Sequence, residues 1–428
     1  MNSRAEKDRL VGARLDARHR AERRFRRLAG ASAYVGLVFL AVLFIAIVEA
    51  GIGAFQKTVI RLDVAIAAPD ANAAAPPGAA RLAAIDTAGL IKETLWRAFP
   101  ELTSRRDRRD LYGLLSIGAA YHLRDRLLAD PALVGRTVPV WLTASDEVAL
   151  VVQGKVARDA PVEVRRLTDN QLAWLETLEK DGRVAVRFND IFLTAGDSRE
   201  PELSGIAGAT LGSLMSVVVC LAVAFPLGVM AAIYLEEFAP RNRWTDFIEI
   251  NINNLAAVPS IVFGLLGLAV FLNVFHMPRS APLVGGLVLA LMTLPTIIIA
   301  GRAAVKAVPP SIREAALALG ASRVQTAFHH VLPLAMPGVL TGTIIGTARA
   351  LGETAPLLMI GMVAFVVDLP QSVLAPATAL PVQVFLWADN PERAFEERAA
   401  AAIIVLLAFT CIMNLTAVLL RRRLEIRW

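Results

Sequence analysis

Six long apolar stretches constrain this chain more than any other feature of its sequence. Each holds about 20 residues or more, the length that a helix needs to cross the hydrocarbon core of a bilayer. No water satisfies backbone polar groups there, so each stretch must be helical. With 56% hydrophobic residues, the chain is predicted to be an all-α polytopic membrane protein. The predicted spans cover residues 31–53, 206–234, 248–271, 282–303, 337–367 and 399–420.

The basic residues lie beside these spans and predict how the chain crosses the membrane. Lys and Arg are concentrated in residues 1–30, 235–247, 304–335 and 421–428. Cytoplasmic loops carry such an excess, so both termini are predicted to be cytoplasmic, and the alternation holds for all six spans. The loops near 273–281 and 368–398 are then external. The formal charge of +6 belongs largely to these flanking clusters, so we expect contact with the lipid bilayer and no binding of nucleic acid.

Residues 56–204 differ in kind, because charges of both signs are dense and no apolar run is long enough to span. Residues 65–80, with three prolines among alanines, are predicted to form a linker. The predicted elements are helices over 86–98, 106–129 and 168–179 and a strand over 184–188 that continues through 191–193. Thr168 and Gln171 match a capping box. We predict an extracytoplasmic α+β domain inserted between the first two spans.

The Arg105–Arg109 segment is a positive cluster within this region, reading Arg-Arg-Asp-Arg-Arg. Such a cluster is either an anion-attracting patch or the solvated face of a helix. The carboxylates of Asp107 and Asp110 offset its charge, so we favour the solvated face.

The remaining chemistry-bearing residues predict neither catalysis nor a bound metal or cofactor. Cys220 and Cys411 both lie in apolar stretches, so no disulfide is expected. The five histidines lack ligand spacing with Cys or clustered carboxylates. The Walker pattern of Gly, four residues, then Gly-Lys-Ser/Thr does not occur, so any ATPase must be a separate polypeptide. The chain is therefore predicted not to be an enzyme.

The stretch from Glu314 to Pro333 predicts a protrusion between two spans. Its first residues, through Leu319, are strong helix formers. Gly320 then permits a bent backbone, and Ser322 can cap a second short helix that ends before Pro333. A helix, a bend and another helix make a shape that fits a groove of another protein.

The same stretch resembles the signature of permease subunits of ABC importers: Glu-Ala-Ala, three residues, Gly, and Leu-Pro after eleven more. The matching residues are Glu314, Ala315, Ala316, Gly320, Leu332 and Pro333. The resemblance implies that the 304–335 loop is a coupling helix that docks on a cytoplasmic ATPase. His330 departs from the pattern, since the family usually has an aliphatic residue there.

The predicted span over 337–367 carries two further features. Gly338, Gly342 and Gly346 recur every four residues, which lets another helix approach closely, so we assign them to helix packing. Arg349 and Glu353 are four apart and should share a helix face. Charges inside a span are costly and commonly mark a translocation pathway or a gate. We favour that function for the pair over the alternative, a structural ion pair that fixes helix packing.

Longer strings strengthen the resemblance and narrow it to the phosphate-specific permeases, the PstA family, over about residues 205–428. These strings cover residues 225–235, 254–267, 347–358 and 377–387. The resemblance implies the type I ABC importer permease fold over residues 205–420 and a location in the bacterial inner membrane. The implied partners are a PstC-like second permease, a PstB-like ATPase dimer and a PstS-like periplasmic phosphate-binding protein. Residues 56–204 resemble a domain of unknown function found before the core in some of these transporters.

The function implied is import of inorganic phosphate, with this chain forming half of the translocation pathway. Two alternatives stay open. A permease for another oxyanion, molybdate or sulfate, would keep the 304–335 loop but lose the phosphate-specific strings. A membrane sensor would use the external domain to bind a ligand, but the sequence contains no recognisable cytoplasmic output module.

Overall fold

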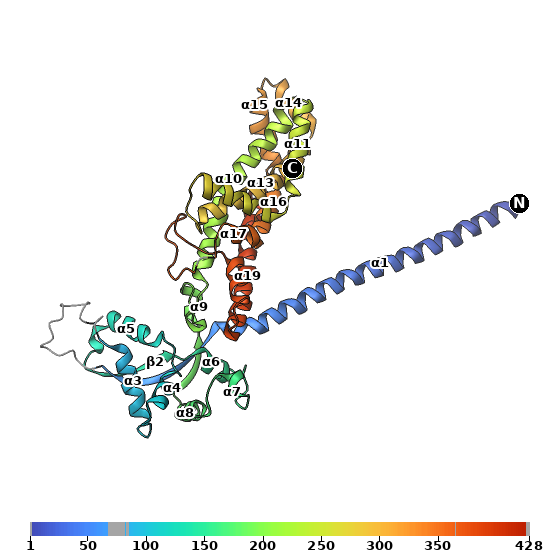
Figure 1. The fold of residues 1–428 in the computed structure, drawn as a ribbon. Helices are drawn as coiled ribbons and strands as arrows, with labels where there is room; N and C mark the ends of the chain where they lie inside the picture. The colour runs from blue at the N-terminus through green and yellow to red at the C-terminus, as the bar shows by residue number, and fades with distance from the viewer. Residues whose placement is uncertain (1, 67–81, 83–84, 364, 425–428) are drawn as a thin grey trace. The chain divides into compact units, whose positions relative to one another are not determined.

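The computed structural model describes residues 2–66, 82, 85–363 and 365–424, and it divides into two compact units, residues 1–50 and 51–428. The first unit is one uninterrupted helix, α1 (Asn2–Gly51) (Figure 1). A 3-10 turn, Ile52–Phe55, follows it. The apolar part, from Ala21 to Phe55, is long enough to cross a membrane and contains the predicted span 31–53.

The first part of the second unit is built on a three-stranded antiparallel sheet with the strand order β2-β1-β3. The strands are β1 (Gln56–Ala65), β2 (Thr137–Thr143) and β3 (Val184–Phe188). Leu62 of β1 lies opposite Val140 of β2. Because alternate side chains of a strand share one face, the buried Ile60, Leu62 and Val64 all point the same way.

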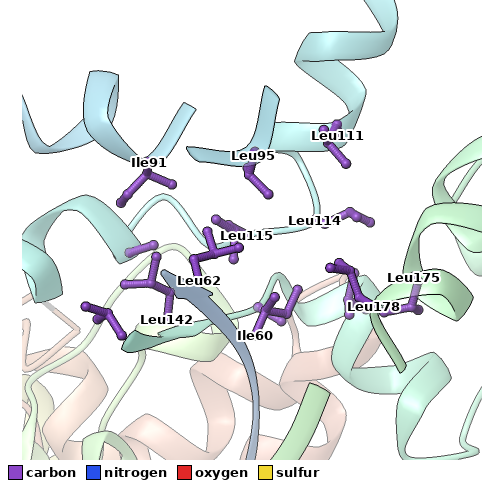
Figure 2. Close-up of a cluster of buried hydrophobic side chains, with 14 of the residues drawn as sticks. Ile60, Leu62, Ile91, Leu95, Leu111, Leu114, Leu115, Leu142, Leu175 and Leu178 are labelled. Carbon is purple, nitrogen blue, oxygen red and sulfur yellow. The ribbon is translucent and has the colours of Figure 1, made fainter. Parts of the chain in front are cut away.

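Short helices lie in this part of the chain, and five of those described contribute buried side chains to the core on this face. They are α3 (Thr87–Ala98), α4 (Arg105–Tyr112), α5 (Ala119–Ala129), α6 (Asp146–Val152), α7 (Val162–Arg165), α8 (Asp169–Lys180) and α9 (Asp190–Thr194), with 3-10 turns at Pro131–Leu133 and Pro201–Leu203. Figure 2 shows Leu95, Leu111 and Leu175, from three of these helices, in one cluster with Ile60 and Leu62 of the sheet. The cluster is the hydrophobic core of this region.

Several local predictions for this region are confirmed and two are wrong. Thr168 and Gln171 form the predicted capping box at the start of α8. The helix predicted over 106–129 is broken into α4 and α5, because the intervening Leu115 bridges to Ala144 beside the sheet. Residues 191–193 belong to α9, whose first turn is capped by the side chain of Asn189, rather than to a strand. Residues 67–80 of the predicted linker lie outside the described residues.

Most of the rest of the chain is helical. The long helices are α10 (Ala207–Ile233), α11 (Arg243–Ala256), α13 (Pro282–Lys306), α16 (Leu332–Gly352) and α19 (Arg393–Leu424). The shorter ones are α12 (Ser260–Gly267), α14 (Pro310–Ala318), α15 (Arg323–Gln325), α17 (Ala355–Met359) and α18 (Leu380–Ala388). π-helical turns occupy Tyr234–Phe238, Leu268–Val274 and Thr326–Val331. Over the described part of the chain, five helices are long and apolar enough to span, or six if α11 and α12 count as one.

Two predicted spans are not continuous helices. The span over 248–271 is replaced by α11 and α12, which are bent by 101°. Pro259 causes this break, since it lacks an N–H and disfavours helical backbone at the residue before it. The span over 337–367 ends at Gly352, because the backbone of Glu353 is extended (φ −79°, ψ 121°). A separate short helix, α17, begins two residues later.

The start of α19 is tied to the region that carries the sheet. The buried guanidinium of Arg398 donates a hydrogen bond to the backbone carbonyl of Ala54, at 3.1 Å, just before β1 begins. Next to it, Glu397 pairs with Lys155, which follows α6. These contacts join the last helix of the chain to the sheet.

The glycines predicted to mediate helix packing lie where α16 meets α13. A Cβ built on Gly338 would lie 2.6 Å from the Cβ of Ala304, and one built on Gly342 would clash with Ala300. Gly346 is less constrained, since its Cβ would lie 3.8 Å from the Cβ of Thr293. The close approach of the two helices therefore depends on the first two glycines.

Adding one methyl group at Gly338 should destabilise the protein, whereas the same change at Gly346 should not. At Gly338 the helices must move apart, which costs about 1–3 kcal/mol. At Gly346 the added methyl makes an ordinary contact, and alanine favours a helix over glycine by roughly 0.5–1 kcal/mol. Thermal unfolding of purified Gly338→Ala and Gly346→Ala measures the difference. Equal melting temperatures for the two variants would contradict this account of the packing.

Candidate functional site

The 304–335 segment, which connects α13 to α16, has the bent shape that the sequence predicts. Glu314 lies in α14, the first of its helices. Gly320 follows with φ +89°, a left-handed conformation that glycine adopts at little cost. Ser322 and Gln325 form a capping box at the start of α15. The chain therefore reverses direction between two helices over a few residues.

The sequence predicts that the second helix of the segment ends before Pro333, and this prediction is wrong. The α15 turn passes into the π-helical turn Thr326–Val331 and then directly into α16, with Pro333 in the first turn of that helix. Proline is tolerated in a first turn because its missing N–H would have no partner there, and the wider π turn changes which carbonyls are paired. The segment is thus continuous with a predicted membrane-spanning helix.

One face of the 304–335 segment is apolar and exposed. Leu319, at the bend, is 90% exposed, and Leu317, Val324 and Phe328 are each about half exposed. Large apolar side chains that are exposed in this way are typical of a surface that another molecule covers. The carboxylate of Glu314 is exposed on the same segment.

The opposite face is buried against the ends of α10 and α13. Ala327 and Val331 pack in one cluster with Val229, Ile233 and Val305. Among the residues matched to the signature, Ala316 is buried, Ala315 is exposed, and Leu332 and Pro333 are half-buried at the start of α16. The exposed apolar face is therefore held on a packed base.

Ion pairs that sequence reasoning missed fix this base. The guanidinium of Arg313 donates to Glu237, at 2.7 and 2.9 Å, and to the carbonyl oxygens of Val305 and Val308. All of its contacts thus lie at the ends of α10 and α13. The Arg313 side chain is 23% exposed and that of Glu237 is 13% exposed. Partly buried charged hydrogen bonds of this kind are stronger than those on an open surface.

A second arginine links three helices. Arg302 of α13 pairs with Glu236, at 2.8 Å, and with Glu249 of α11, at 2.5 Å. The sequence offered one signal for these pairs, the adjacent acids Glu236 and Glu237 at the end of a predicted span. Their partners lie 66 and 76 residues further along the chain, so no local pattern identifies them.

Arg349 and Glu353 are in contact, although not on one continuous helix. Arg349 lies in the last turn of α16, whereas Glu353 follows the helix end. The guanidinium Nε of Arg349 lies 3.4 Å from a carboxylate oxygen of Glu353. The Arg349 side chain is 51% exposed and that of Glu353 is 19% exposed. Other residues of the chain therefore leave part of the Arg349 side chain uncovered.

Comparison with known families identifies two parts of the chain. Residues 224–426 match the binding-protein-dependent transport system inner membrane component. Residues 12–162 match a domain of unknown function, DUF3333. The first match contains the 304–335 segment, Arg349 and Glu353.

Three of the relatives that match this chain are each similar to about half of it. The phosphate transport system permease protein PstA 1 of Mycobacterium tuberculosis is 33% identical over 217 residues, which cover 51% of this chain and 70% of the relative. The PstA of Haemophilus influenzae is 30% identical over 246 residues, covering 57% and 85%. The probable ABC transporter permease protein YqgI of Bacillus subtilis is 31% identical over 241 residues, covering 53% and 81%.

A solved structure of the MetNI methionine ABC transporter in an inward-facing conformation aligns with 52% of this chain and 96% of its own chain, at 15% identity and a TM-score of 0.41. A score of that size supports no inference about this chain. The sequence matches carry the assignment, and by them the chain is a membrane permease of an ABC importer. It belongs to the PstA-like permeases within the binding-protein-dependent transport family. The family makes it a transport subunit rather than a catalytic one.

Removing the Arg313 guanidinium should loosen the 304–335 segment. Arg313→Gln leaves the mostly buried Glu237 carboxylate unpaired, at a cost of about 1–3 kcal/mol. We expect faster chymotrypsin cleavage after Leu319 and Phe328 and a lower melting temperature. Arg323→Gln, an exposed position in the same segment, is the matched control and should behave like the wild type. Identical cleavage rates in the two variants would show that the Arg313 pair does not hold the segment.

Proposed function

We propose that this chain is the permease subunit of an ATP-driven importer of inorganic phosphate and forms half of its translocation pathway. The observation that carries the proposal is the match to a relative named as a phosphate transport permease, 70% of whose length is covered. The phosphate-specific strings of the sequence support the same substrate. The proposed location is the bacterial inner membrane, with residues 205–420 as the permease core.

The proposed orientation places both termini in the cytoplasm. The basic residues 1–30 and 421–428 support this, because cytoplasmic segments carry an excess of Lys and Arg. The 304–335 segment and residues 235–247 are then cytoplasmic as well. Residues 56–204, which follow the first span, are then a periplasmic domain.

The 304–335 segment is proposed to couple ATP hydrolysis to transport. Its exposed apolar face, with Leu319 at the tip, would dock in a groove of a PstB-like ATPase dimer, which hydrolyses ATP in place of this chain. Arg313 and the packed base would transmit movement of the docked face to α13 and α16, since they hold the segment to both helix ends. Closure of the ATPase dimer would then rock the spans between inward-open and outward-open states.

Arg349 is proposed to meet the anion in the translocation pathway, with Glu353 as its charge partner. A charged side chain in a span commonly faces an aqueous path or a partner, and half of the Arg349 side chain is left uncovered. Glu353, 3.4 Å away, would keep the site neutral when no anion is present. Arg349 would thus exchange the carboxylate of Glu353 for the transported anion during transport.

The proposed complex contains three further kinds of subunit. They are a PstC-like second permease, which supplies the other half of the pathway, the ATPase dimer, and a PstS-like periplasmic phosphate-binding protein. The binding protein would select the substrate. A permease of the same architecture for molybdate or sulfate is the alternative.

Phosphate uptake in cells that carry the complete operon tests both assigned roles. Glu314→Lys reverses a charge on the docking face, so we expect loss of ATPase assembly and uptake reduced at least about tenfold. Arg349→Gln should leave the assembly intact and reduce uptake to a similar extent, with partial rescue by Arg349→Lys.

Glu101→Lys is the matched control, since it makes the same charge change at an exposed position outside the segment and should import normally. Co-purification of the ATPase separates the two defects. Wild-type uptake by Glu314→Lys and Arg349→Gln would refute both roles. Import of labelled molybdate or sulfate in place of phosphate would retain the architecture and refute the substrate.

A further inference from the structure

A basic cavity with aromatic walls lies on the 56–204 region, well separated in sequence from the transport core. Its volume is about 380 Å³, within the range of small-molecule pockets. The residues that line it come from α3 and α4: Lys92, Trp96, Arg105, Arg108, Arg109 and Tyr112. Four of the six are cations, and none is an acid. A ligand for this cavity must therefore be an anion.

Aromatic rings, rather than carboxylates, hold two of these cations in place. The ammonium of Lys92 lies 4.9 Å from the centre of the Tyr112 ring, and the guanidinium of Arg108 lies 5.1 Å from that of Trp96. Arg108 also donates to the backbone carbonyl of Leu102, at 2.8 Å. A ring or a carbonyl positions a cation without neutralising it. The charges are thus pre-arranged and remain available.

Two acids near the cavity have partners outside it. Asp110 pairs with Arg106, the arginine of α4 that does not line the cavity. Asp86 caps α3 by accepting from the N–H of Gly89. Over the part of the chain that the structure describes, Lys92, Arg105 and Arg109 make no ion pair. The offset from Asp110 therefore falls on Arg106, and the four cations that line the cavity outnumber the carboxylates of Asp86 and Asp107 near it.

The chemistry of the cavity selects among anions. Four like charges around one cavity repel one another, and a multivalent anion relieves that repulsion better than a monovalent one. Planar guanidinium groups match phosphoryl oxygens with paired hydrogen bonds. The volume leaves room beyond a single phosphate ion.

We propose that this cavity binds a multivalent phosphoryl anion larger than inorganic phosphate, such as a phosphate ester or a short polyphosphate. The site is separate from the pathway assigned to Arg349, and it gives the N-terminal region a ligand-binding role of its own. A dissolved anion and a phosphate-bearing lipid headgroup share this chemistry.

Calorimetric titration of the full-length protein with pyrophosphate, in nanodiscs of phosphatidylcholine, tests the proposal. We expect one site whose affinity falls as salt is added, and which is at least about tenfold weaker in Arg108→Gln and in Lys92→Gln. Arg136→Gln removes the same charge from an exposed position of the same region, outside the cavity, and should bind like the wild type. Arg349→Gln should also leave binding unchanged, which separates this site from the transport pathway.

Three results would overturn the assignment. They are no binding of pyrophosphate, an equal loss in Arg136→Gln and Arg108→Gln, and binding of inorganic phosphate as tight as that of pyrophosphate. Melting temperatures confirm that the variants are folded, and Lys92→Gln carries the test if Arg108→Gln is not. Repeating the titration with phosphatidylglycerol in the discs identifies the source, since a headgroup site is weakened by competition and a site for dissolved anions is not.

Discussion

The structure depends on the close approach of α13 to its two neighbours, α10 and α16. Lipid chains are as apolar as leucine, so helices in a bilayer gain little from burying apolar surface and rely on van der Waals contact between their backbones. Gly338 of α16 permits that contact with Ala304 on one side of α13. On the other side, Gly228 of α10 leaves room for Ile297. These three packed helices hold the exposed 304–335 segment and the ion pairs of Arg302 and Arg313 in place.

The 304–335 segment is exposed and yet rigidly attached, and the two properties come from different residues. Leu319 at the bend has almost no contact with its own chain. Arg313, six residues earlier, is bonded to Glu237 and to two carbonyls. In the docking proposed for this segment, a bonded base would pass the movement of the partner to the spans, whereas a flexible loop would absorb it.

Local signals in the sequence predicted this segment well, because its shape is set by neighbours in the chain: Gly320 makes the bend, and Ser322 and Gln325 form the cap. Hydropathy located the apolar stretches but not the breaks within them. It measures solubility in lipid, and a single Pro259 or the extended backbone at Glu353 ends a helix without changing that solubility. Ion pairs such as Arg302 with Glu236 join distant parts of the chain, so only the fold brings them together.

The contacts at the start of α19 have a mechanical consequence. The 304–335 segment continues unbroken into α16, α16 packs on α19, and α19 holds the backbone at Ala54 through Arg398 and the ammonium of Lys155 through Glu397. The sheet region is therefore bonded to the last helix. A tilt of α19 must move the sheet region with it or stretch the ion pair. Coupling of this kind is reciprocal. Whatever restrains the sheet region therefore also restrains the start of α19, through the hydrogen bond of Arg398 and the ion pair of Glu397.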